Sequence, residues 1–185
     1  MIPVCLSLFF LACNNDEKSS VEKADSANQS KEDRLPDNQV ADESSSSFLV
    51  DAANGGMAEV EISKLVNDKS TNAKVKSFAT MMVNDHTGVN GEVKSLAAKK
   101  NITLPADMSN DKKEKANELS NKTAADFDKA YMQTMVSDHK ATIDLFEKAS
   151  NNVKDAEVKS FIDATLPKLR SHLEMAQDVS SGLKK

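Results

Sequence analysis

Four long amphipathic stripes constrain this chain more than any other feature of its sequence. Within each stripe, mostly apolar side chains recur every three or four residues, which places them on one face of an α-helix. The stripes lie within residues 48–67, 72–100, 124–150 and 155–181. No segment shows the alternating pattern that is typical of a half-buried strand. The sequence therefore predicts an all-α protein in which four helices bury their stripes together as a four-helix bundle.

The connection between the second and third predicted helices is the longest. Residues 101–122 contain Leu104-Pro105 and a polar stretch that predicts a short extra helix. We expect this connection to cross one end of the bundle. Two helix starts carry capping signals: Asp155 is a predicted N-cap, and Thr123 is followed three residues later by Asp126.

The first thirteen residues differ in kind from the rest of the chain. Residues 1–13 are uncharged and mostly apolar, but too few to span a bilayer, which takes about 20 residues. Their end, Phe10-Leu11-Ala12-Cys13, resembles a bacterial lipobox, in which the cysteine after a small residue receives lipid. We predict a signal peptide over 1–13 and lipidation of Cys13. An uncleaved N-terminal anchor is the alternative.

Only one other cysteine, Cys5, is present, and it lies within the predicted signal. The folded part therefore has no thiol for a disulfide or for thiol catalysis.

Residues 14–47 are polar and low in complexity. This segment has almost no large apolar side chain, so it predicts a disordered tether that cannot bury enough surface to fold. It carries nine acidic and four basic side chains, which account for the whole net charge of −5. Residues 48–185, the predicted bundle domain, are therefore neutral. Because a basic surface is missing, we expect no nucleic-acid partner.

Polar side chains interrupt the apolar stripes at a few positions. His86 and His139 occupy stripe positions, His172 lies beside its stripe, and Glu59 occupies the stripe of the first predicted helix. Imidazole and carboxylate groups that point into one bundle core could hold one divalent ion such as zinc, copper or iron. The neighbouring carboxylates cannot easily bind the same ion, because one residue turns a helix by about 100°. We expect these carboxylates to orient the metal ligands without contacting the ion. They are Asp85, Asp138 and Glu61.

A purely structural interpretation of these polar residues stays open. Buried polar groups need hydrogen-bond partners, and a Glu–His bond across the core would supply them without a metal. A di-iron centre is excluded, since such bundles place Glu three residues before each ligand His. The corresponding positions here are all apolar: Val83, Val136 and Leu169.

Four sequence motifs lie along the predicted helices. They are Phe48-x3-Ala52-x2-Gly55-Gly56-Met57-x-Glu59-x-Glu61, Val75-Lys76-x-Phe78-Ala79-x2-Met82-x2-Asp85-His86, Phe127-Asp128-x2-Tyr131-x3-Met135-x2-Asp138-His139 and Leu166-Pro167-x4-His172-Leu173. Together these motifs resemble one bacterial family, the domain-of-unknown-function family 4142, over residues 48–182. The resemblance implies a ferritin-like four-helix bundle exported to the cell envelope, and it implies no particular activity.

These observations lead to one functional expectation and one alternative. We expect a lipid-anchored outer-membrane lipoprotein, facing the periplasm or the surface, that binds the membrane through Cys13. No complete catalytic set of residues is evident, so we expect a non-enzymatic binding or interaction module whose protein partner the sequence does not identify. The alternative is a metal-buffering protein that uses Glu59, His86, His139 and His172.

Overall fold

The structure is a computed structural model that describes residues 18–36 and 41–183. These residues form seven helices and no strand, which confirms the predicted all-α fold. The predicted signal peptide and Cys13 lie outside the described residues. None of the helices found in residues 18–36 and 41–183 is long and apolar enough to cross a membrane. The helices are α1 (Ser20–Glu32), α2 (Glu43–Lys64), α3 (Val66–Lys69), α4 (Ala73–Lys99), α5 (Asn110–Ser120), α6 (Ala124–Asn152) and α7 (Ala156–Gly182).

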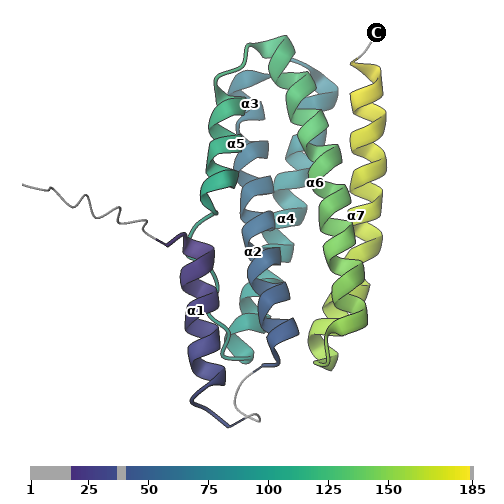
Figure 1. Ribbon diagram of the computed structural model, residues 1–185. Helices are drawn as coiled ribbons and strands as arrows, with labels where there is room; N and C mark the ends of the chain where they lie inside the picture. The colour runs from purple at the N-terminus through teal and green to yellow at the C-terminus, as the bar shows by residue number, and fades with distance from the viewer. Residues whose placement is uncertain (1–17, 37–40, 184–185) are drawn as a thin grey trace, which may run out of the picture.

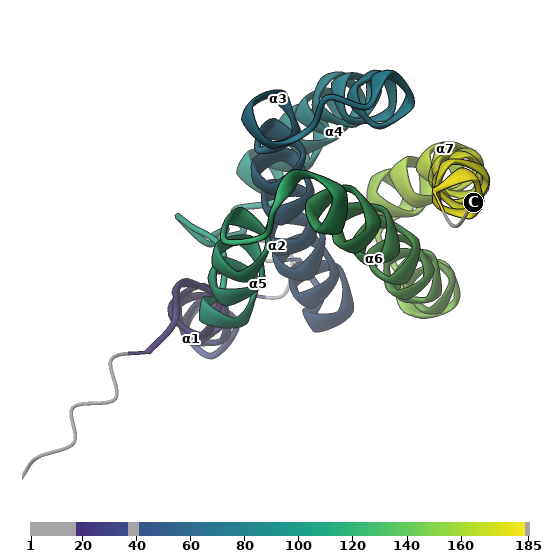
Figure 2. The same ribbon diagram turned by 90° about the horizontal axis from the view of Figure 1, so that it is seen from above.

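The four long helices α2, α4, α6 and α7 form the bundle (Figure 1). Helix α2 packs against α4 and α6, and α7 packs against the same two helices from the other side. Figure 2 shows these four helices around a common interior, with α1 and α5 outside α2. The stripes that predict the four helices therefore point into one core.

Helix α5 does not cross an end of the bundle, contrary to our expectation. Helices α4 and α6 run in the same direction, so the chain must return along the length of the bundle between them (Figure 1). Helix α5 makes this return on the outside, where it packs against α2 and α6. Residues 101–122 thus carry the chain back along the side of the bundle and do not cover its end.

The apolar core is divided into two clusters. The Phe146 cluster fills one end, where the Phe48 and Phe146 rings meet edge to face with centroids 4.9 Å apart. The Tyr131 cluster fills the other end, where the Phe127 and Tyr131 rings stack at 5.9 Å. On every long helix, a buried polar residue lies between the two clusters, and these residues are Glu59, His86, His139 and His172. We call these four residues the polar layer.

The prediction of a disordered tether over residues 14–47 is wrong where the structure describes that segment. Residues Ser20–Glu32 form α1, and α2 begins at Glu43 rather than at Phe48. Residues 14–17 and 37–40 lie outside the described residues. The bundle domain therefore begins before residue 48.

Polar contacts hold α1 in place. The Asn28 side chain is buried and pairs with the backbone of Thr103, donating to its carbonyl at 2.9 Å and accepting from its N–H at 2.7 Å. Lys31 donates to the carbonyl of Asn101 at 2.6 Å. Asn101 itself has a φ of 56° and ends α4 in a left-handed cap, which turns the following loop toward α1. These hydrogen bonds replace the apolar stripe that α1 lacks.

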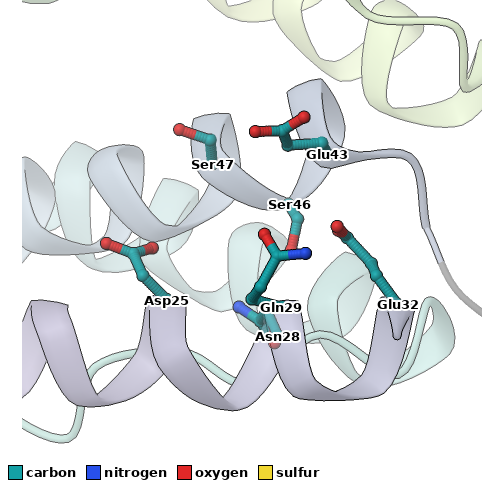
Figure 3. Close-up of a pocket in the computed structure, with 7 residues that line it drawn as sticks. All are labelled: Asp25, Asn28, Gln29, Glu32, Glu43, Ser46 and Ser47. Carbon is teal, nitrogen blue, oxygen red and sulfur yellow. The ribbon is translucent and has the colours of Figure 1, made fainter. Parts of the chain in front are cut away.

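An open pocket of about 130 Å³ lies between α1 and the first turns of α2. Figure 3 shows its polar lining, with Asp25 and Glu32 on α1 and Glu43 and Ser47 on α2. Burial and the charge of Glu43 raise the pKa of Glu32. The contact between α1 and α2 is therefore polar and acidic, unlike the contacts between the four long helices.

The two predicted N-caps differ in the structure. Asp155 caps α7 as expected, because its carboxylate accepts from the amides of Glu157 at 2.9 Å and Val158 at 3.1 Å. Lys100 adds an ion pair at 2.6 Å. Thr123 precedes α6, but its side chain accepts no hydrogen bond from the helix backbone.

We expect Asp155→Ala to lower the free energy of unfolding by about 1 to 2 kcal/mol at pH 7, as loss of an N-cap does. Burial would raise the pKa of Asp155, but the Lys100 ammonium and the two amides hold it below its ordinary value. The carboxylate's contribution is therefore present at neutral pH and disappears as the carboxyl group is protonated in acid. Denaturant titrations of the two proteins should converge as the pH falls below about 4.

Thr123→Ala is the matched control, since it removes a residue at the same helix position that makes no cap bond. Its effect should be clearly smaller than that of Asp155→Ala. Equal losses for the two variants would show that the cap of α7 contributes nothing specific.

Candidate metal centre

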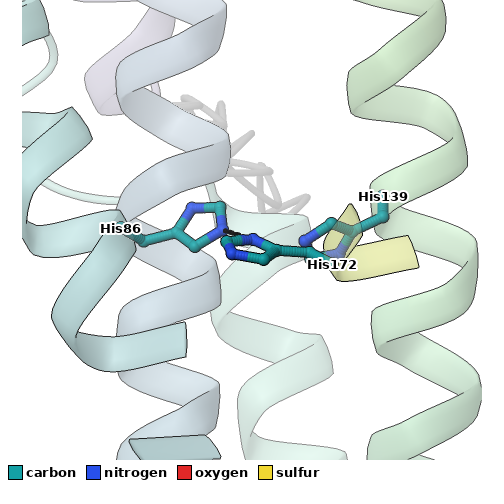
Figure 4. A group of neighbouring side chains, drawn as sticks. All are labelled: His86, His139 and His172. Atoms are coloured by element: carbon teal, nitrogen blue, oxygen red, sulfur yellow. Dashed lines mark hydrogen bonds between the residues drawn. The ribbon is translucent and has the colours of Figure 1, made fainter. Parts of the chain in front are cut away.

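Each long helix contributes one residue to the polar layer. Glu59 lies on α2, His86 on α4, His139 on α6 and His172 on α7. All four are almost completely buried, with exposed fractions of 3% or less. Figure 4 shows the three imidazole rings approaching one another from separate helices. The structure thus brings together all four residues that the sequence singles out for the core.

The distances within the layer are short. Glu59 Oε2 lies 3.0 Å from His86 Nδ1, and Glu59 Oε1 lies 3.5 Å from His139 Nδ1. His86 Nε2 lies 3.3 Å from His172 Nδ1. One ring nitrogen from each of the three histidines lies within 4.8 Å of one from each of the others. This arrangement can hold a metal ion.

One nitrogen of each ring has an acceptor that fixes its proton. The Nδ1 of His86 donates to Glu59, and the Nε2 of His172 donates to Asp85 Oδ2 at 2.8 Å. The Nδ1 of His139 donates to the carbonyl of Met135 at 2.9 Å, one turn earlier on α6. Metal-binding histidines are usually oriented in this way, with the second nitrogen donating to a carboxylate or a carbonyl. The nitrogens left for a ligand are Nε2 of His86, Nε2 of His139 and Nδ1 of His172.

The contact between His86 and His172 requires a proton or a metal ion between the two rings. With both outer nitrogens donating to carboxylates, the two inner nitrogens would face each other as lone pairs at 3.3 Å. Either a proton or a metal ion must lie there to make the contact favourable. Two nitrogens bound tetrahedrally to zinc at 2.0–2.1 Å lie about 3.3 to 3.4 Å apart, so the spacing suits either.

Two buried atoms of the layer have no hydrogen-bond partner. They are His139 Nε2 and Glu59 Oε1. A buried polar atom without a partner is uncommon in a native core and indicates a missing ion, a missing water or a functional role. The ring centroid of His139 lies 5.6 Å from those of His86 and His172, and its unpartnered Nε2 is a further lone pair that a metal ion could satisfy.

The ionisation of the layer favours metal binding. Burial lowers the pKa of His139 and of His172, although the neighbouring Glu59 and Asp85 partly oppose this effect. Burial would raise the pKa of Glu59, but the His86 and His139 imidazoles hold it below its ordinary value. At neutral pH, His139 and His172 are therefore neutral with a free lone pair, and Glu59 is ionised. Metals bind neutral imidazole.

The three carboxylates that were expected to orient the ligands differ in what they contact. Asp85 contacts His172 on α7 rather than a residue of its own helix. Asp138 is partly buried, with Lys112 3.9 Å away, and its Oδ2 has no partner. Burial raises the pKa of Asp138.

The expectation for Glu61 is wrong. Its side chain is 50% exposed and pairs with Lys64 at 2.6 Å. Two residues turn a helix by about 200°, which points Glu61 away from the core side on which Glu59 lies.

Asn90 is a further buried polar group near the layer, and the sequence did not predict it. This residue lies one turn beyond His86 on α4, and its Oδ1 is buried without a partner. A Cβ added to Gly56 would lie only 2.0 Å from that oxygen, so the absence of a side chain at Gly56 is what makes room for Asn90. The spacing of four residues from His86 is the signal that could have identified it.

We expect Glu59→Ala to lower the free energy of unfolding by about 1 to 3 kcal/mol, because it leaves the buried Nδ1–H of His86 without its acceptor. Glu61→Ala is the matched control on the same helix and should change stability by less than about 0.5 kcal/mol. Chemical denaturation of both variants checks this. A small loss for Glu59→Ala would show that Glu59 does not support the imidazoles.

Comparisons with known proteins agree with this fold. A DUF305 fragment from Deinococcus radiodurans superimposes with a TM-score of 0.69 at 10% identity, covering 77% of this chain and 98% of that one. A DUF305 protein from Streptomyces coelicolor, described as secreted, gives a TM-score of 0.65 at 13% identity, covering 76% and 92%. Both likenesses concern the helical fold alone.

A comparison with curated proteins found no match. The model of one family does match, over residues 22–179, which include α2 to α6, most of α1 and α7, and the whole polar layer. The chain therefore belongs to the domain of unknown function family DUF4142.

Proposed function

We propose that this protein binds one divalent transition-metal ion through Nε2 of His86, Nε2 of His139 and Nδ1 of His172. The observation that carries the proposal is the orientation of the three rings. Each ring has one nitrogen fixed by an acceptor and a second nitrogen that no acceptor or donor outside the three rings engages. Three imidazoles in one buried layer form a ligand set for such an ion.

A polar layer that only stabilised the bundle would not need a third imidazole. One Glu–His pair satisfies a buried carboxylate and fixes the relation between two helices. The third imidazole adds an orphan nitrogen, which costs stability if nothing binds it. An ion bound to the three nitrogens removes this cost and also the lone-pair contact between His86 and His172.

The ligand set restricts the class of ion. Imidazole suits zinc, copper, iron and nickel, whereas magnesium and calcium prefer oxygen ligands. Glu59 lies against the outer nitrogens of His86 and His139, so in the loaded site it supports the ligands rather than binding the ion. Three protein ligands leave a fourth position for water or another small ligand. Holding and releasing the ion, rather than catalysis, is the role that we propose.

We propose that the protein works in the bacterial envelope, anchored to the outer membrane by lipid on Cys13. The supporting feature is the apolar run that ends in Phe10-Leu11-Ala12-Cys13. A structural neighbour that is described as secreted is consistent with export. The membrane is the one partner that these features suggest.

We expect the protein purified without chelator to bind Zn²⁺, Cu²⁺ or Fe²⁺ with a stoichiometry close to one. Ion at about 100 times its Kd should stabilise the fold by about 2.7 kcal/mol, which raises the Tm by about 5 to 10 °C. His139→Ala should lower the affinity by more than about 100-fold, since it removes a ligand rather than a supporting group. Metal analysis and thermal unfolding with added ion measure both effects.

The control for lost stability is Ser63→Ala. Ser63 shares a buried hydrogen bond of 2.9 Å with Tyr131 in the same bundle but does not contact the histidines. This variant should lose about 1 kcal/mol and keep its metal. A parent protein that neither retains metal nor gains thermal stability from any of the three ions would refute the proposal.

We expect the full chain, produced in a bacterial host fed a labelled fatty acid, to incorporate the label. Cys13→Ser should abolish incorporation, because the thiol is the acceptor of the lipid. Cys5→Ser should not affect it, because this residue lies within the signal. Label retained in Cys13→Ser would rule out an anchor at this position.

A further inference from the structure

A small cavity connects the surface to the polar layer between α2 and α6. Its lining includes exposed Asp51 at one end, half-buried Gly55 and Thr142 beyond it, and buried Glu59 and His86 at the inner end. The cavity volume is about 30 Å³, which accommodates one or two water molecules. It is thus a narrow passage with its inner end against the candidate metal centre.

At the inner end of this cavity, two hydrogen-bond acceptors receive no hydrogen bond. Glu59 and Asn90 both line it, and Glu59 Oε1 and Asn90 Oδ1 are both buried without a hydrogen-bond partner. A cavity of this size cannot pass an ion with its full shell of water. Oxygen atoms along the wall can replace lost water ligands of a cation, but they would repel an anion.

The other sides of the polar layer are less suitable for a cation. On the side of α5, Lys112 lies 3.9 Å from Asp138. On the side of α7, Lys168 lies 3.9 Å from Asp85, whose Oδ2 already accepts from His172. The cavity between α2 and α6 has only an acidic side chain, Asp51, among its charged groups before Glu59.

We propose that this cavity is the route by which the metal ion reaches and leaves the three histidines. Asp51 attracts the hydrated ion to the mouth, and the oxygens of Asn90 and Glu59 replace its water ligands before the imidazoles bind it. The two glycines keep the route open, since Gly55 leaves the passage unfilled and Gly56 makes room for Asn90. This inference rests on the proposed metal binding.

Gly55→Leu tests the route directly. No atom lies within 4 Å of a Cβ added at Gly55, so a side chain there can occupy the passage without a backbone clash. Gly88→Leu is the matched control, because Gly88 is an exposed helical glycine on α4 that also has no atom within 4 Å of an added Cβ. Both variants replace a helical glycine, so both should be as stable as the parent or more stable, by about 1 kcal/mol.

The probe is Co²⁺, whose visible absorption reports binding to imidazole nitrogen in a stopped-flow experiment. We expect Gly55→Leu to load and release Co²⁺ at least about tenfold more slowly than Gly88→Leu, with the Kd changed by less than about threefold. A blocked passage slows both directions equally, which leaves the equilibrium unchanged. Asp51→Asn should slow loading modestly and reduce its dependence on salt.

The outcomes separate this inference from the proposed function. If Gly55→Leu binds Co²⁺ as fast as Gly88→Leu, the ion uses another route and metal binding itself stands. If Gly55→Leu loses affinity while its loading rate is unchanged, the substitution disturbs the ligands and the route is again refuted. If the parent binds neither Co²⁺ nor the ions tested above, both proposals fail.

Discussion

The contact between an ionised carboxylate and an imidazole in the middle of the bundle is the interaction on which the packing of the long helices depends. Glu59 on α2 faces His86 on α4 and His139 on α6, and His86 faces His172 on α7. Apolar contacts distinguish one helix register from another less sharply than a buried charge does, because a buried charge that loses its partner is expensive. The polar layer therefore fixes how far each helix is shifted along its neighbours, between two apolar clusters that would tolerate several arrangements.

The bundle and the residues of the layer could be predicted because both follow from helical spacing. A His or Glu in an apolar stripe must enter the core, so Glu59, His86 and His139 could be placed before any coordinates were known. The pairing of Asp85 with His172 could not, since it depends on how α4 and α7 meet. Glu61 does not enter the core beside Glu59, because two residues turn a helix by about 200°.

Helix α1 was missed for a different physical reason. Sequence periodicity detects helices that bury an apolar face, and α1 docks instead through the amide of Asn28 and the ammonium of Lys31. Such contacts depend on a partner loop 70 to 75 residues away in the sequence and leave no local pattern. The course of α5 escaped prediction similarly, because it follows from the parallel directions of α4 and α6.

The docking of α1 also determines how far the domain can move from a lipid anchor. If residues 14–47 were a fully extended chain, the bundle could lie up to about 120 Å from an anchor at Cys13, at roughly 3.5 Å per residue. With α1 docked, only residues 14–19 separate Cys13 from the folded body, a span of at most about 20 Å. In the proposed lipid-anchored protein, the polar contacts of Asn28 and Lys31 therefore keep the bundle within this distance of the membrane, and their release would lengthen the tether several-fold.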